Sequence, residues 1–133
     1  MDIKSLTIYC SSSNLLEDKY YILSEQIGEF LAKNNITLIY GGGSVGMMGA
    51  LSKSTIKCGG NVIGIIPKFL DKKEIIDQNI SKTIIVETMS ERKKILFEKG
   101  DAFLILPGGS GTIEEATEII SWSSKSSLSL AKN

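Results

Sequence analysis

The sequence predicts a doubly wound α/β fold, in which a parallel sheet carries helices on both faces. Two observations predict it. Short β-branched runs alternate along the chain with segments in which apolar residues recur at helical spacing. Most of the strand-like runs are apolar at consecutive positions, which suits strands covered on both faces. Strand–helix units joined by right-handed crossovers build this Rossmann-like architecture, and the 133 residues form a single expected domain, residues 1–133.

Five strands are expected, and one connection between them lacks a clear helical pattern. That connection, residues 68–81, is charged and weakly periodic, which predicts an irregular or short helical crossover. The strands are expected at residues 3–10, 36–40, 61–66, 83–86 and 102–106.

Helices are expected in the other connections. Apolar side chains recur at helical spacing over residues 20–31, and the pattern stops at Asn34 and its neighbour Asn35. Helices over residues 47–57 and 90–99 both run into glycine, which is a common helix stop. A further helix is expected to begin near Thr112.

The order of the strands decides where a ligand is expected. We take the common order in which the third, second, first, fourth and fifth strands are successive neighbours. The order then reverses between the first and the fourth strand, and the crevice beyond their carboxyl ends is the expected ligand site. The loops at this crevice begin at Cys10 and at Glu87.

Composition excludes several classes of function. The 15 Lys and Arg residues balance the 15 Asp and Glu residues, so no overall field attracts nucleic acid or an anionic membrane. Histidine is absent, which excludes a Ser-His or Cys-His nucleophile and a His-based zinc site. Cys10 and Cys58 have neither a disulfide framework nor metal-ligand spacing. No run has the length of a membrane span or the pattern of a signal peptide, so we expect a cytoplasmic protein.

The run after the fifth strand has the pattern of a phosphate-binding loop. Glycines let the backbone approach an anion closely, and the free N–H groups at the start of the helix that follows favour a phosphate. A tight turn without a ligand is the alternative interpretation. Three glycines in four residues at the carboxyl edge of a sheet favour phosphate binding. The predicted phosphate-binding residues are Gly108, Gly109, Ser110, Gly111 and Thr112.

A second glycine loop, residues 41–49, follows the second strand and reads GGGSVGMMG. It contains GxGxxG, but a dinucleotide site is disfavoured because the motif follows the second strand and no acidic residue ends the third. A P-loop is excluded because Gly-Lys-Ser/Thr does not occur. We therefore predict that Gly41, Gly42 and Gly43 form a second wall of the same nucleotide pocket.

Several single residues have two interpretations on local sequence alone. Ser11 either donates to a ligand or caps a helix, and its neighbours favour the cap. Glu115 either faces a sugar or forms a capping box with Thr112. Arg92 and Lys93 have the pattern of a solvated helix face, and methionines are usually packing residues. The methionines in question are Met47, Met48 and Met89.

Three motifs in one order indicate a family: the glycine loop at residues 41–49, Met-Ser-Glu-Arg-Lys at residues 89–93, and PGGSGTIEE at residues 107–115. With this joint pattern, the chain resembles the LOG family, the cytokinin riboside 5′-monophosphate phosphoribohydrolases, whose members are often labelled lysine decarboxylases. The resemblance covers about residues 3–122. It implies that Arg92 and Glu115 are the catalytic pair.

The resemblance also implies a reaction and a set of contacts. Met89, Lys93 and Glu114 become expected nucleotide contacts as members of the motifs. The implied reaction is hydrolysis of the N-glycosidic bond of a nucleoside 5′-monophosphate, AMP or an N6-modified AMP, to a free base and ribose 5-phosphate. A carboxylate near the sugar stabilises an oxocarbenium-like transition state or orients water. No cofactor and no metal are implied, and the implied assembly is a homodimer.

The chain departs from the family pattern at two places. The family commonly has a glycine before its serines where this chain has Cys10, and family members continue beyond the tryptophan helix with a further strand and helices. We therefore expect a chain truncated relative to the family, in which the fifth strand or a helix face loses its cover. Two alternatives stay open: a nucleotide- or molybdenum-cofactor-binding module without catalysis, and a pyridoxal-phosphate-dependent lysine decarboxylase, for which no lysine is marked.

Overall fold

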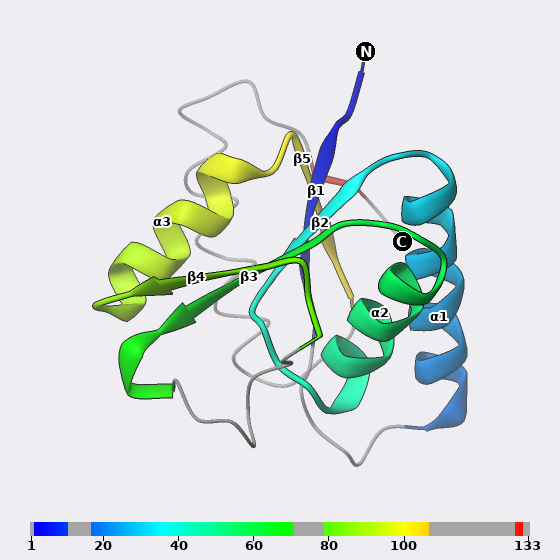
Figure 1. Cartoon of the computed structure of the whole chain (residues 1–133), viewed down its shortest axis with the longest axis horizontal. Coiled ribbons are helices and arrows are strands. Elements are labelled where there is room, and N and C mark those ends of the chain that lie inside the picture. Colours follow the sequence, from blue (N-terminus) through cyan, green and yellow to red (C-terminus); the bar gives the residue numbers. More distant parts are fainter. Residues whose placement is uncertain (1, 11–16, 71–78, 107–129, 132–133) are drawn as a thin grey trace.

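The computed structural model describes residues 2–10, 17–70, 79–106 and 130–131. In these ranges the chain forms one parallel sheet with the order β4-β3-β2-β1-β5-β6 (Figure 1). The doubly wound α/β class is therefore confirmed. The strands are β1 (Ser5–Tyr9), β2 (Thr37–Tyr40), β3 (Val62–Pro67), β4 (Lys82–Val86), β5 (Ala102–Ile105) and β6 (Leu130–Ala131).

Helices cover both faces of the sheet, as predicted. The two helices α1 (Asp18–Lys33) and α2 (Gly46–Lys57) lie side by side on one face, and α3 (Met89–Lys99) lies on the other (Figure 1). A short 3-10 helix, η1 (Lys68–Leu70), follows β3. It confirms a short helical turn at the start of the irregular crossover expected over residues 68–81.

The core has two layers because side chains alternate across each strand. Ile8 and Leu38 face α1 and α2, where they pack with Leu31 and Leu51. Their strand neighbours face α3 and form the second layer with Leu96; these are Tyr9, Ile39 and Phe103. The rings of Phe97 on α3 and Phe103 on β5 stack with centroids 5.1 Å apart. The consecutive apolar positions in the strands thus serve two separate helix layers.

The helix ends fall where the sequence predicted them. The helix α1 stops before Asn34 and Asn35, and Asn35 has a φ of 55°, a left-handed conformation that asparagine tolerates better than most residues. Beyond α2, Gly59 has a φ of 86°, which glycine adopts without strain. The helix expected from Thr112 lies outside the described residues.

The expected strand order was wrong in one respect. The strand β4 pairs with β3 at the outside of the sheet, and β5, rather than β4, pairs with β1. Burial gives the reason: most of β4 is exposed or half-buried, which an edge strand tolerates, whereas Phe103 in β5 has no exposed surface. The reversal of order, where doubly wound sheets bind ligands, therefore lies between β1 and β5.

The side of β5 away from β1 is also paired. Residues 130 and 131 form β6, which aligns Leu130 with Phe103 and Ala131 with Leu104. Of the two expectations, an uncovered fifth strand is wrong at these two positions, because backbone pairing continues the sheet there. An uncovered helix face stays a prediction.

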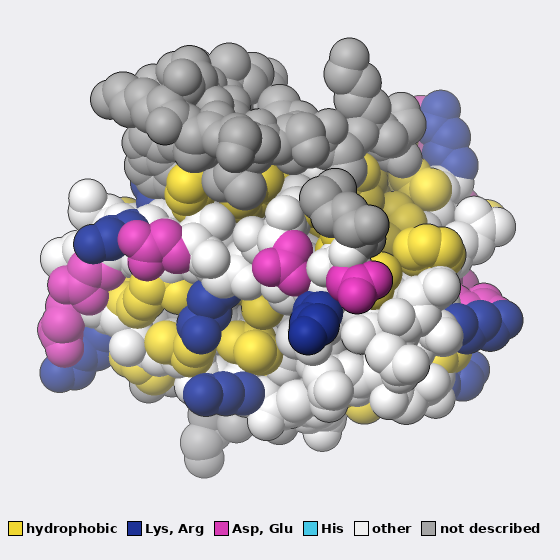
Figure 2. All heavy atoms as spheres, turned by 90° about the horizontal axis from the view of Figure 1, so that it is seen from above, with side chains coloured by type: hydrophobic (Ala, Val, Ile, Leu, Met, Phe, Trp, Pro, Cys, Tyr) yellow, Lys and Arg dark blue, Asp and Glu magenta, His cyan; other side chains and the backbone are white. Residues whose placement is uncertain are grey.

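The surface carries mixed charge, in agreement with the balanced composition. Figure 2 shows the end of the molecule where β1 begins, and acidic and basic side chains lie interspersed on it. Among the described elements, no helix has both the length and the apolar character needed to cross a membrane.

Candidate functional site

The described part of the candidate site lies at the carboxyl ends of the strands. The chain leaves β2 at Tyr40 and enters the glycine loop at once. It leaves β4 at Val86 and reaches the first turn of α3, which carries Arg92, within a few residues. Because all these strands are parallel, both segments lie at one edge of the sheet.

The guanidinium of Arg92 joins three segments of the chain. Its Nε donates to the carbonyl oxygen of Ile65 in β3 at 3.0 Å, and its Nη2 donates to the carbonyl oxygen of Gly41 after β2 at 3.2 Å. The side chain is half-buried. The interpretation of Arg92 as a solvated surface charge is therefore wrong, because the planar fork of donors is held by backbone carbonyl groups of β3 and of the loop after β2.

The start of α3 is fixed by a reciprocal cap. The Oγ1 of Thr88 accepts from the backbone N–H of Glu91 at 3.1 Å, and the Oε2 of Glu91 accepts from the backbone N–H of Glu87 at 3.1 Å. The first contact satisfies an N–H group that the start of the helix leaves without a partner, and the second ties the helix to the residue before its N-cap. Together they hold the turn from which Arg92 projects. Sequence reasoning missed this cap, although Thr88-x-x-Glu91 has the capping-box spacing.

The glycines of the loop are required by the packing of the protein itself. A Cβ on Gly41 would overlap Nη2 of Arg92. Gly42 has a φ of 82°, and a Cβ there would lie 2.5 Å from Cγ1 of Ile66. A Cβ on Gly43 would lie 2.9 Å from Sδ of Met48. Each of the three predicted nucleotide-binding glycines thus has an internal reason to lack a side chain.

The loop also folds back tightly onto α2. The hydroxyl of Tyr40 donates to the carbonyl oxygen of Gly43 at 3.2 Å, and a Cβ on Gly49 would overlap the carbonyl oxygen of Ser44. Met47 has no exposed surface, which confirms it as a packing residue. The backbone at this edge is therefore held in one arrangement by contacts from both ends of the loop.

The remaining predicted residues of α3 lie near its start. Lys93 is half-buried, whereas Met89, at 37% exposure, is not a core residue. The packing interpretation of Met89 is therefore wrong, and its expected nucleotide contact stays a prediction.

The other predicted site residues lie outside the described residues, but the points from which the chain reaches them are defined. The backbone N–H of Leu106 donates to the carbonyl oxygen of Tyr9 at 2.9 Å, so the ends of β1 and β5 are neighbours. From this point the chain continues after Cys10 and after Leu106 into the predicted segments. The residues not described are Ser11, Gly108, Gly109, Ser110, Gly111, Thr112, Glu114 and Glu115.

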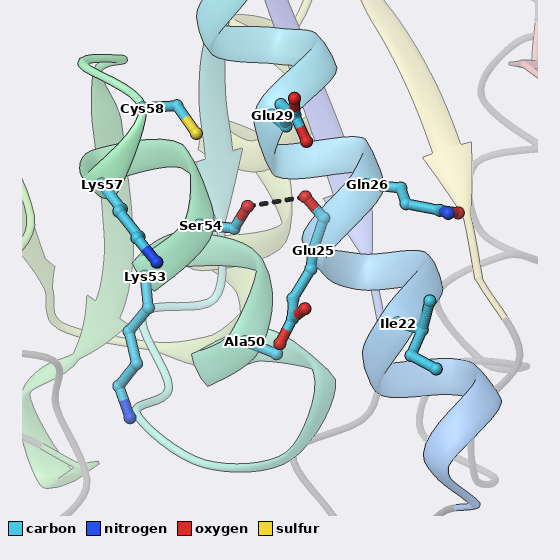
Figure 3. Close-up of a pocket in the computed structure, with 9 residues that line it drawn as sticks. All are labelled: Ile22, Glu25, Gln26, Glu29, Ala50, Lys53, Ser54, Lys57 and Cys58. Atoms are coloured by element: carbon cyan, nitrogen blue, oxygen red, sulfur yellow. Dashed lines mark hydrogen bonds between the residues drawn. The ribbon is translucent and has the colours of Figure 1, made fainter.

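A separate groove lies between α1 and α2. It has a volume of about 520 Å³ and is lined by charged residues of both helices, among them Glu25, Glu29, Lys53 and Lys57 (Figure 3). At its floor, Ser54 Oγ donates to the carbonyl oxygen of Glu25 at 2.6 Å. The groove lies on the layer formed by α1 and α2, so it is distinct from the site at the carboxyl ends of the strands, where Arg92 of α3 lies. Within the described ranges, no three Cys, Asp or Glu side chains are grouped as a metal ion would require.

The fold and the site together define a class: a doubly wound α/β protein with an arginine and a glycine loop at the carboxyl edge of its sheet. A protein family described as "Possible lysine decarboxylase" matches residues 48–128, which is more than half of the chain. The chain belongs to this family, the LOG family, as the resemblance implied.

Curated relatives carry the name that the motifs indicated. The chain is 42% identical over 120 residues to cytokinin riboside 5′-monophosphate phosphoribohydrolase LOG2 of Arabidopsis thaliana, covering 90% of this chain and 56% of that protein. It is 39% identical over 121 residues to the cytokinin riboside 5′-monophosphate phosphoribohydrolase of Rhodococcoides fascians, covering 90% of this chain and 61% of the relative. The chain thus spans between half and two thirds of the length of these relatives.

Solved structures share the fold at low identity. The molybdenum cofactor binding protein of Rippkaea orientalis matches with a TM-score of 0.77 and 20% identity, covering 92% of this chain and 74% of that chain. The Moco carrier protein of Chlamydomonas reinhardtii matches with a TM-score of 0.76 and 19% identity, covering 96% of this chain and 74% of that chain. At such identities the likeness concerns the fold alone.

Proposed function

We propose that the protein hydrolyses the N-glycosidic bond of a nucleoside 5′-monophosphate. Water is consumed, and the products are a free base and ribose 5-phosphate. The observation that carries the proposal is the fixed guanidinium of Arg92 at the carboxyl edge of the sheet. Support comes from the relatives, since a protein 42% identical over 120 residues is named a cytokinin riboside 5′-monophosphate phosphoribohydrolase.

In this proposal Arg92 binds the ribose or phosphate side of the substrate. A guanidinium is always charged and presents its donors in one plane, so it suits a phosphate or a pair of ribose oxygens. Two of its donors are hydrogen-bonded to the carbonyl oxygens of Ile65 and Gly41, and these bonds fix the plane of the guanidinium before substrate binds. A group held in this way needs no reorganisation during the reaction, which favours the transition state.

The proposed partner of Arg92 is the carboxylate of Glu115. As bond cleavage proceeds, positive charge develops on the ribose, and a carboxylate near the sugar stabilises this charge or orients the attacking water. The departing base takes up a proton, while water supplies the hydroxyl that forms on the anomeric carbon. This role rests on the motif PGGSGTIEE and on membership of the family.

The 5′-phosphate is proposed to bind the glycine run that follows β5. The adjacency of Tyr9 and Leu106 supports this, because the run begins at the reversal between β1 and β5, the usual ligand position in such sheets. Binding energy from the phosphate then positions the scissile bond. The further proposed nucleotide contacts are Ser11, Gly42, Gly43, Met89, Lys93, Gly108, Gly109, Ser110, Gly111, Thr112 and Glu114.

We also propose that the protein is a cytoplasmic homodimer and that its binding partner is a small-molecule substrate. The alternative, a carrier of nucleotide or molybdenum cofactor without catalysis, gains no specific support, because the carrier structures share only the fold at 19–20% identity.

The test is incubation of the protein with AMP and with an N6-substituted AMP, followed by chromatography. We expect base and ribose 5-phosphate in equal amounts, and no base from Arg92→Ala or Glu115→Gln. Lys53→Ala in the groove between α1 and α2 is the control and should retain activity. The longer Arabidopsis relative serves as the positive control. Tight binding of AMP without release of base, while the relative is active, would overturn the proposal.

A further inference from the structure

Gly41 and Arg92 occupy a common space. A Cβ on Gly41 would overlap Nη2 of Arg92, and it would lie 3.1 Å from Cε of Met48. The backbone of Gly41 is outside the left-handed region, unlike those of Gly42 and Gly46, whose φ values are 82° and 62°. The requirement for glycine at position 41 is therefore a matter of space rather than of backbone conformation.

The guanidinium has little freedom to move aside for a methyl group. Its hydrogen bonds go to the carbonyl oxygen of Ile65 in β3 and to that of Gly41, the first residue after β2, so a shift of the guanidinium breaks or lengthens at least one of them. Movement of the loop is also restricted, because Gly42 packs against Ile66. Of the two described side chains nearest this point, Met48 is the one whose flexible end can accommodate a methyl group.

We propose that Gly41 is a positioning residue for Arg92. Its carbonyl oxygen orients the guanidinium, and its missing side chain provides the room in which the guanidinium lies. The loop after β2 thus contributes to the reaction through Arg92 rather than through a contact of Gly41 with the nucleotide. The inference rests on the proposed function for its effect on catalysis, but its structural part stands on these contacts alone.

The structural part is tested by a double-mutant cycle on thermal stability, which requires no activity. In the otherwise unchanged protein, Gly41→Ala should lower Tm by about 4 °C or more, because the new methyl group displaces the guanidinium. In an Arg92→Ala background the space is vacant, so the same substitution should change Tm by about 1 °C or less. Equal changes in both backgrounds would overturn the proposal.

The catalytic part is tested by steady-state kinetics with AMP. Gly41→Ala should lower kcat by about a hundredfold with a smaller change in KM, because a displaced reacting group costs rate more than ground-state binding. Gly60→Ala is the matched control, because a Cβ on Gly60 would lie 2.7 Å from Cγ2 of Thr55 and is therefore also crowded. Gly60 precedes β3, at the end of the strand away from Arg92. It should lose stability and keep kcat at a temperature where it is folded.

The two proposals fail in different ways. An unchanged kcat with a raised KM in Gly41→Ala would show that Gly41 contacts substrate directly, and the positioning role would be wrong. If the parent protein releases no base while the Tm cycle shows coupling, the proposed function fails and the structural relationship between Gly41 and Arg92 remains.

Discussion

Thr7 Oγ1 donates a hydrogen bond of 2.7 Å to the carbonyl oxygen of Leu96, and both residues are buried. Leu96 is in the last turn of α3, where carbonyl groups have no partner within the helix. Ser5 Oγ likewise donates to the carbonyl oxygen of Lys99, at 2.7 Å. The first strand therefore terminates the helix that carries Arg92, and Gly100 allows the approach, because a Cβ there would overlap Oγ1 of Thr7.

Replacement of Thr7 by valine should destabilise the protein without changing its shape. Valine has nearly the same volume, but it leaves the buried carbonyl of Leu96 without its donor, which costs about 1–3 kcal/mol in the free energy of unfolding. Urea denaturation measures the change. Thr7→Ser keeps the hydroxyl and should recover part of the loss; equal stabilities of the valine variant and the parent would contradict the prediction.

Arg92→Lys should impair catalysis, even though the substitution keeps the positive charge. Arginine reaches Ile65 and Gly41 with two donors of one planar group, whereas an ammonium is a point charge on a flexible stem. If the proposed function holds, kcat/KM for AMP should fall by about a hundredfold or more in Arg92→Lys. Lys94→Arg, an exposed exchange two residues away, is the control and should leave kcat/KM unchanged.

Gly28→Ala should destabilise the protein, against the usual preference for alanine in helices. The helices α1 and α2 approach closely here, since a Cβ on Gly28 would lie 2.7 Å from Cβ of Ser54 and 2.9 Å from the carbonyl oxygen of Leu51. We expect a loss of about 1–3 kcal/mol in urea denaturation. Gln26→Ala on the exposed side of α1 is the control, and a stabilised Gly28→Ala would show that the two helices separate at no cost.

Because of one exposed ion pair, we expect the stability of the protein to depend slightly on pH in the acid range. Lys33 Nζ lies 2.7 Å from Oε1 of Glu29, and the hydrogen bond and charge of Lys33 lower the pKa of Glu29 below its ordinary value of 4.5. A carboxyl whose pKa is lowered on folding stabilises the protein above the ordinary pKa and loses this effect as the pH falls through the folded value.

Glu29→Gln should therefore lower Tm slightly at neutral pH and leave it unchanged at a pH well below 4.5. Because the pair is exposed, the difference should be small and should shrink in high salt. Calorimetry over the acid range measures it, with Glu25→Gln on the same helix as the comparison. A Tm difference that grows as the pH falls would contradict the prediction.

Much of the fold was predictable because its signals are local. Apolar spacing marked the helices, and Asn35 and Gly59 marked helix ends that the structure confirms. The place of β4 and β5 in the sheet was not predictable in this way. Both are short apolar runs, and only their burial in the assembled sheet separates the exposed edge strand from the inner one.

The sequence by itself determined the fold class, the motifs and the family, because periodicity, glycine runs and motif order are properties of neighbouring residues. The family motif marked Arg92 as a catalytic residue, but the local pattern alone described it as one charge on a helix surface. Only the tertiary structure decided that Arg92 lies on Gly41, 51 residues earlier in the chain, because the pairing of β2 with β3 and the fixed start of α3 bring them together. A contact of this kind depends on distances between elements, which local sequence does not encode.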